Sequence, residues 1–319
     1  MPFLRTVLGD IQSRDAGVSY AHEHIIIDHS FTTFRYPEFL IDSVQKAVAD
    51  VEKFRAAGGK TLVDSMPCGG GRNVCKLAEI ARRTGVNILC PTGLHLAKYY
   101  APGHWADRLT AKELAQLFLS EIEEGIDGAD CNGPTIVRTA HRAGLIKVAT
   151  GRNGLSAREE KIFEAAAAAH RSSGAPILTH TEQGEWGLEQ ITCLKSRGVN
   201  LSHVVLSHTD RKPDAAYHKE LLSTGVMLEY DSAFRWKAEQ GNPTEDLVVE
   251  MFAGGYGGQI LLGMDTARRS YWRSYGGKPG LAFLLEEFVP RLRSRGLSQA
   301  NIDSIFIDNP ARCYAFDCH

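Results

Sequence analysis

Residues 19–27 read Ser-Tyr-Ala-His-Glu-His-Ile-Ile-Ile, an apolar stretch that holds two histidines separated by one residue. Residues i and i+2 of a β-strand point to the same face, so His22 and His24 can reach one metal ion from a strand. The same spacing would not place both rings on one face of a helix. A His-x-His pair alone is more often structural than metal-binding, so the rest of the chain must decide.

Short apolar runs alternate along the chain with longer amphipathic segments. The runs predict strands at residues 19–25, 61–66, 87–93, 144–149, 175–180, 203–208, 225–230 and 259–265. Several are apolar on consecutive residues, a pattern typical of strands buried on both faces of a parallel sheet. Eight such strands alternating with helices predict a (β/α)8 TIM barrel, which we expect to form a single domain over residues 1–319. A doubly wound open sheet is the alternative, but it requires a glycine-rich turn where His22-Glu23-His24 stands.

Local signals place several helices. Thr110–Glu113 and Ser156–Glu159 have the pattern of capping boxes, and the helix that follows the second one should end near Gly174. The longest insert, residues 94–143, separates the third and fourth strands and should contain a helix at 111–124. The sequence thus predicts one large loop insertion in an otherwise regular barrel.

The composition is that of a globular protein with a sizeable core: 319 residues, 43% hydrophobic, with a net charge of −2. No overall basic field attracts nucleic acid or an anionic membrane. No apolar stretch of about 18 residues is present, and the N-terminus lacks a secretory signal pattern. Seven scattered cysteines without a CxxC pair suit reduced thiols, so we expect a cytoplasmic protein.

Polar side chains recur where the predicted strands end, which is where the chemistry of a barrel collects. Besides the first pair, these residues are Lys147, His180, His208 and Asp265. Each has a structural alternative: a histidine can be a hydrogen-bonded core residue, and Asp265 can cap a helix. A structural role explains Lys147 less well, because an unpaired buried lysine costs several kcal/mol or loses its proton. Six such residues in one register predict a centre for zinc, manganese or cobalt.

This series of strand-end residues resembles that of the phosphotriesterase family of the amidohydrolase superfamily. Near its end the chain also contains Asn309-Pro310-Ala311-Arg312, which resembles the C-terminal signature of that family. The resemblance spans essentially the whole chain. It implies a hydrolase with two divalent metal ions at the C-terminal ends of the barrel strands.

The resemblance also implies a role for each residue. The pair in His22-Glu23-His24, together with Asp265, would bind the more buried ion, and His180 and His208 would bind the more exposed one. Lys147, converted by carbon dioxide to a carbamate, would bridge the two ions together with a hydroxide. Asp265 would orient this hydroxide and take up its proton. The expected ion is Zn²⁺, with Mn²⁺ or Co²⁺ as alternatives.

Cations and aromatic residues gather in the loops after the seventh and eighth strands. The candidate substrate-binding residues in these loops are Arg235, Lys237, Arg268, Arg269, Tyr271 and Arg273. In a protein of net charge −2 this cluster predicts a phosphorylated or carboxylated substrate, because arginine matches the geometry of both anions. Surface salt bridges in a solvated loop are the alternative.

The loop after the third strand offers a second set of candidates. Family members that hydrolyse lactones carry a tyrosine in this region, and either Tyr99 or Tyr100 can match it. Cys68 either lines the mouth of the barrel or packs beneath it. His203 begins the sixth strand and should therefore lie at the opposite end.

The sequence therefore predicts a hydrolase that opens a lactone, with an anionic, phosphorylated sugar lactone as the expected small-molecule substrate. Hydrolysis of a phosphotriester, another carboxylic ester or an N-acyl amide by the same centre is the alternative. A non-catalytic binding protein is disfavoured because all six centre residues are present. Neither nucleic acid nor a membrane is an expected partner. A homodimer is expected because relatives often form dimers.

Overall fold

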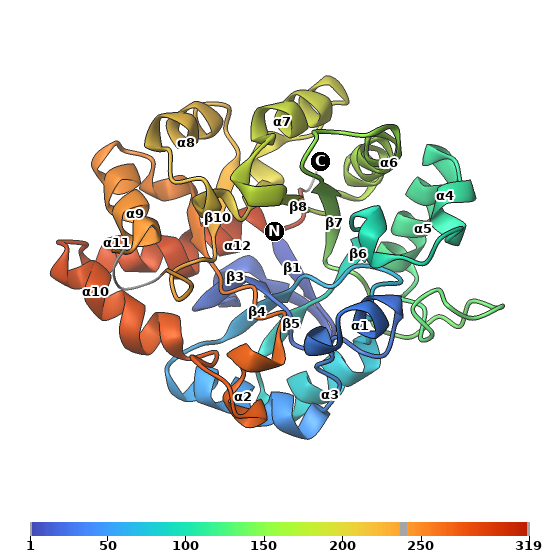
Figure 1. Cartoon of the computed structure of the whole chain (residues 1–319), viewed down its shortest axis with the longest axis horizontal. Coiled ribbons are helices and arrows are strands. Elements are labelled where there is room, and N and C mark those ends of the chain that lie inside the picture. Colours follow the sequence, from blue (N-terminus) through green and yellow to red (C-terminus); the bar gives the residue numbers. More distant parts are fainter. Residues whose placement is uncertain (1, 237–240, 318–319) are drawn as a thin grey trace.

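The computed structural model describes residues 2–236 and 241–317, and within them parallel strands surround a central axis while helices cover the outside (Figure 1). The barrel strands are β3 (Ser19–Glu23), β4 (Thr61–Asp64), β5 (Asn87–Leu89), β6 (Pro91–Gly93), β7 (Leu145–Thr150), β8 (Ile177–Thr181), β9 (Val204–Ser207), β10 (Met227–Tyr230) and β11 (Ile260–Leu262). β5 and β6 together occupy the third strand position, so the predicted (β/α)8 barrel is confirmed. No helix in the described residues is long and apolar enough to cross a membrane.

The barrel wall consists of two runs of hydrogen-bonded parallel strands. One run has the order β3-β4-β5, and the other runs from β6 to β11 in sequence order. The third strand, predicted as one piece over 87–93, is interrupted at Cys90. The wall closes where the carbonyl oxygen of His22 accepts hydrogen bonds from the backbone N–H groups of Met264 (3.2 Å) and Asp265 (2.9 Å).

Glu23, the middle residue of the histidine motif, strengthens this closure. Its buried carboxylate accepts hydrogen bonds from the Met264 N–H (2.9 Å) and from the Thr266 hydroxyl (2.7 Å). Burial raises the pKa of Glu23 to about 8. The two neighbouring histidines point to the other face of the strand. The motif therefore ties the first strand to the end of the eighth and also presents two imidazoles.

Helices and 3-10 turns follow the strands as the barrel pattern requires. The α-helices are α1 (Phe31–Arg35), α2 (Val44–Ala56), α3 (Val74–Thr84), α4 (Trp105–Arg108), α5 (Ala111–Glu123), α6 (Ala157–Ser173), α7 (Gly187–Ser196), α8 (Ala215–Leu222), α9 (Pro243–Ala253), α10 (Val289–Ser294), α11 (Gln299–Asp303) and α12 (Asn309–Cys313). Both predicted capping boxes form, at Thr110 and at Ser156. α6 ends at Gly174, whose left-handed backbone (φ 73°) suits a residue without a Cβ.

The N-terminal end of the barrel is closed by apolar packing. A hairpin of β1 (Phe3–Thr6) and β2 (Gly9–Gln12) contributes Leu4 to a buried cluster that includes inward-facing residues of the barrel strands, such as Leu145 and Leu178. Tyr314, just after α12, joins this cluster and donates its hydroxyl to the Ala21 carbonyl oxygen at 2.7 Å. A cavity on the barrel axis can therefore open only at the other end.

A buried ion cluster attaches the long insert to the barrel. Arg72, in the loop after β4, makes two hydrogen bonds to the Glu121 carboxylate of α5 (2.7 and 2.8 Å) and one to Asp130 (3.0 Å). It also donates to the Pro91 carbonyl oxygen at 2.7 Å. Cys68 packs in the same region, fully buried. The insert thus supports the loop that carries Cys68 and Arg72.

We predict that Arg72→Ala lowers the free energy of unfolding by about 3–5 kcal/mol, because it leaves two carboxylates buried without their cation. Arg83→Ala is the matched control: its ion pair with Glu79 is exposed and contributes less than about 0.5 kcal/mol. Urea denaturation followed by circular dichroism measures both. Equal losses in the two variants would show that the cluster does not stabilise the fold.

Candidate active site

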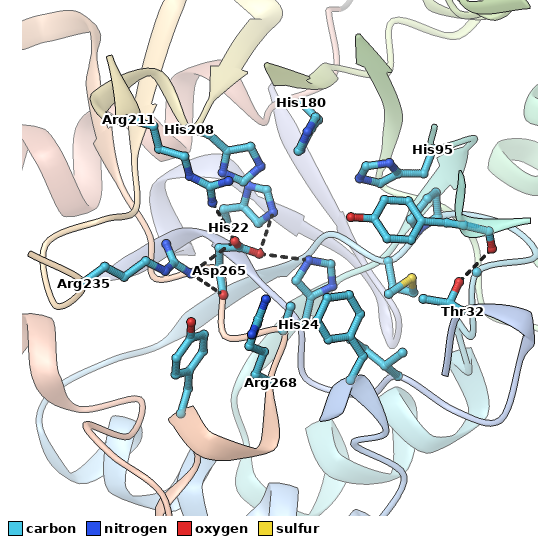
Figure 2. A pocket seen from close by; sticks show the side chains of 18 of the residues that line it. His22, His24, Thr32, His95, His180, His208, Arg211, Arg235, Asp265 and Arg268 are labelled. Carbon is cyan, nitrogen blue, oxygen red and sulfur yellow. Dashed lines mark hydrogen bonds and ion pairs between the residues drawn. The ribbon is translucent and has the colours of Figure 1, made fainter. Parts of the chain in front are cut away.

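A cavity of about 370 Å³ opens at the C-terminal ends of the barrel strands. Five of the six predicted metal-ligating residues line it, namely His22, His24, His180, His208 and Asp265 (Figure 2). They come from the first, fifth, sixth and eighth strand positions. The barrel therefore brings together side chains that lie more than 240 residues apart in the sequence.

One group of ligand atoms converges around Asp265. Its Oδ1 lies 3.3 Å from Nε2 of His24 and 3.8 Å from Nε2 of His22. The ligand atoms of these three residues all lie within 4.8 Å of one another. Two imidazole nitrogens and one carboxylate oxygen at such separations fit a single divalent ion.

A second group is formed by His180 and His208, whose ring centroids are 4.6 Å apart. Each ring has one nitrogen engaged by the protein. Nδ1 of His208 contacts the Asp231 carboxylate, and Nε2 of His180 lies 3.1 Å from Glu182. A carboxylate partner fixes the orientation of an imidazole and leaves its other nitrogen for a metal. Sequence reasoning missed both carboxylates, because neither belongs to a recognisable motif.

Three histidines of the cavity, His22, His180 and His208, are held in their neutral form, which is the form that binds metals. Burial, reinforced by Lys147, lowers the pKa of His22 well below its usual range. Burial lowers the pKa of His180 too, and that of His208 to about 3. Each therefore offers a lone pair at neutral pH.

Lys147 lies in β7 behind the cavity wall and is 1% exposed. Its Nζ has no hydrogen-bond partner among the described residues, although it is buried. Burial lowers the pKa of this amine to about 8. An amine without a partner is a costly group inside a protein, so its position fits a residue whose partner is a metal centre.

The backbone at two of these residues is unusual. His208 has φ 66° and Asp265 has φ 46°, both in the left-handed region that side chains rarely adopt. Such conformations cost on the order of 1 kcal/mol or more and cluster at functional sites. Here they turn the chain at the ends of β9 and β11, where both side chains line the cavity.

Two arginines hold the other side of Asp265. Its Oδ2 lies 2.8 Å from Arg211 and 3.1 Å from Arg235 (Figure 2). Both arginines also contact the Asp231 carboxylate. Although burial opposes it, contact with His24 and Arg235 keeps the pKa of Asp265 well below its usual range. We predicted Arg235 as a substrate ligand. The structure places it in the cavity wall with its guanidinium engaged by carboxylates and backbone oxygens.

The predicted arginine cluster divides into two groups. Arg268 lines the cavity together with Tyr271. Arg269 and Arg273 are not among the lining residues: the first donates to the Leu40 carbonyl oxygen and the second to that of Pro279. We therefore leave these two out of the candidate site, because the loop turns them away from it. Lys237 lies outside the described residues.

The structure distinguishes the two tyrosines after the third strand. Tyr99 lines the cavity. Tyr100 is buried beneath it, where its hydroxyl accepts from the His95 N–H (2.8 Å) and donates to the Cys68 carbonyl oxygen (3.0 Å). Tyr100 is therefore a structural residue. His203 contacts the Cys313 carbonyl oxygen in α12, away from the cavity as expected.

Comparison with known proteins gives the family. The sequence matches the phosphotriesterase family over residues 2–314. It is 35% identical to a phospho-furanose lactonase of Mycoplasmopsis agalactiae, covering 99% of this chain and 92% of the relative. The fold is similar to the crystal structure of an amidohydrolase from Mycoplasma synoviae, with a TM-score of 0.95 and 33% identity over 99% of this chain and 92% of that one. It is also similar to that of a lactonase from Listeria monocytogenes, with a TM-score of 0.91 and 31% identity over 99% of this chain and all of that one.

The chain therefore belongs to the phosphotriesterase family of the amidohydrolase superfamily and is a metal-dependent hydrolase. Membership implies a binuclear metal centre, and the convergent imidazoles and carboxylate described above fit one.

We predict that Tyr100→Phe lowers the free energy of unfolding by about 1–3 kcal/mol, because it leaves a buried N–H and a buried carbonyl oxygen without their partner. Tyr99→Phe should change stability by less than about 0.5 kcal/mol, since its hydroxyl has no hydrogen-bond partner in the described part of the chain. Thermal unfolding of both variants tests this. A larger loss for Tyr99→Phe would contradict the assignment.

Proposed function

We propose that this protein hydrolyses a phosphorylated sugar lactone, with Arg268 binding the phosphate. The observation that carries the proposal is the contrast between Arg268 and the other two arginines of the cavity. Arg211 and Arg235 have carboxylates as partners. Arg268 lines the same cavity without a hydrogen bond or an ion pair to any described residue. Arg268 is exposed to the cavity, so its guanidinium is free to bind an anion that comes from outside the chain.

The surroundings of Arg268 suit a sugar phosphate. Its guanidinium lies 5.5 Å from the centre of the Phe39 ring, which leaves its five N–H donors available. Tyr271 follows it on the cavity wall and offers a phenol hydroxyl. Arginine binds phosphate oxygens in a bidentate manner, so this corner can hold the charged end of a substrate.

Two relatives support a lactone as the reacting group. The relative from Mycoplasmopsis agalactiae is named a phospho-furanose lactonase, and a second one of that name from Mycoplasmopsis synoviae is 34% identical to this chain. A phosphotriester is the alternative substrate for the same centre. A phosphotriester has no anionic group that Arg268 could bind, so it accounts less well for the presence of this arginine in the cavity.

The residues of the site would form two sets of ligands, one for each of two metal ions. Zn²⁺ is the proposed ion. His22, His24 and Asp265 would hold one ion, and His180 and His208 the other. Lys147 would supply a bridging oxygen after its neutral amine has reacted with carbon dioxide. The ions would lower the pKa of a bound water and polarise the lactone carbonyl.

Asp265 is the residue best placed to move the proton. Its Oδ1 faces the metal-ligand histidines, while its Oδ2 is held by two guanidiniums that keep their protons at any working pH. A proton taken up at Oδ1 therefore has no route outward through Arg211 or Arg235. It would pass instead to the leaving oxygen of the opened lactone, a poor leaving group that needs a proton.

We predict that Arg268→Ala reduces kcat/KM for a phosphorylated lactone by about 10–100-fold, mainly through KM, because a charge-assisted hydrogen bond to phosphate is lost. Hydrolysis of the same lactone without phosphate should hardly change. Arg273→Ala is the matched control, an arginine of the same loop outside the cavity. Steady-state kinetics with a pH indicator measures all four combinations. A loss of equal size on both substrates would rule out phosphate binding by Arg268.

We predict that Lys147→Ala loses at least one of the two ions while the barrel stays folded, because the oxygen that bridges them is gone. Elemental analysis after dialysis gives the metal content, and circular dichroism reports the fold. Lys219→Ala, which removes an exposed lysine paired with Glu250, should keep both ions. A Lys147→Ala variant that retains two ions would show that this residue is not the bridge.

A further inference from the structure

His95 is a residue of the cavity wall whose Nε2 has no hydrogen-bond partner among the residues that the structure describes. It lies just after β6 and packs edge-on against Tyr99, with ring centroids 4.6 Å apart at 83°. Its ring centroid is also 4.8 Å from that of His180. Figure 2 shows it beside His180 and well separated from Arg268. It thus faces the metal-ligand side of the cavity rather than the phosphate corner.

The position of His95 is fixed by its backbone. Its N–H donates to the Tyr100 hydroxyl at 2.8 Å, and its carbonyl oxygen accepts from Arg158 at 2.9 Å. The ring is fixed as well, since Nδ1 accepts a hydrogen bond from the Leu96 N–H at 2.7 Å. The side chain is therefore held in one orientation before any substrate binds.

The hydrogen bond to Nδ1 also decides the tautomer. A neutral imidazole that accepts through Nδ1 carries its proton on Nε2. Because Nδ1 is occupied as an acceptor it holds no proton, so the ring is the neutral form rather than an imidazolium. Nε2–H has no acceptor within the described part of the chain. His95 is thus a fixed, neutral hydrogen-bond donor in the cavity.

We propose that His95 determines substrate specificity by donating a hydrogen bond from Nε2 to a hydroxyl group on the lactone ring. A neutral donor matches a neutral oxygen, whereas the anionic group of the substrate is met by the cation Arg268. The two residues would thus recognise opposite ends of one molecule. This inference rests on the proposed sugar-lactone activity and adds the residue that recognises a ring hydroxyl by hydrogen bonding.

The test compares two variants on two kinds of substrate. His95→Phe keeps an aromatic ring but removes the donor, and His95→Gln places an amide N–H near the position of Nε2. The probes are a phosphorylated furanose lactone and analogues that each lack one ring hydroxyl. We expect His95→Phe to reduce kcat/KM for the hydroxylated lactone about tenfold, and His95→Gln to restore most of it. For one deoxy analogue, wild type and His95→Phe should differ less than about twofold.

A His95→Phe variant that is fully active on the hydroxylated lactone, or that loses the same factor on every analogue, would overturn the proposal. A long-range ¹H–¹⁵N spectrum of the histidine rings gives an independent readout. It should show His95 protonated on Nε2, and protonation on Nδ1 would overturn the inference whatever the kinetics. A wild-type protein that hydrolyses none of these lactones would instead refute the proposed function itself.

Discussion

An amine buried without a hydrogen bond is the constraint on which the rest of this structure depends. Lys147 is 1% exposed, and its Nζ has no partner among the described residues. Such a group costs several kcal/mol unless it is neutralised or paired. An apolar residue would fill the same space at no such cost. The lysine is therefore best explained by the cluster of imidazoles and the carboxylate next to it, which belongs to a metal-dependent hydrolase.

The cluster is assembled by contacts between elements that are distant in the sequence. Glu23 ties the first strand to the backbone that leads into Asp265, and this fixes the two histidines beside it relative to that carboxylate. On the other side, Asp231 orients His208 and binds the same guanidiniums that hold Asp265. The ligand geometry is thus set by buried carboxylates as well as by the barrel.

The fold and the centre could be predicted from the sequence because both depend on regular patterns. The two-residue period of a strand predicted that His22 and His24 share one face. The rule that the active site of a barrel lies at the C-terminal ends of its strands predicted the end at which Lys147 lies. The loops could not be predicted in this way. Tyr99 and Tyr100 differ only in how a single 3-10 turn directs them, and the orientation of the loop arginines depends on which backbone oxygens each one reaches.

The most direct test of the account is a crystal structure of the protein grown with Zn²⁺ and bicarbonate, with anomalous scattering recorded at the zinc edge. The account predicts two anomalous peaks. One lies among His22, His24 and Asp265, the other beside His180 and His208, and extra density extends from Nζ of Lys147 between them. A single peak, or two peaks beside an unmodified lysine, would contradict it.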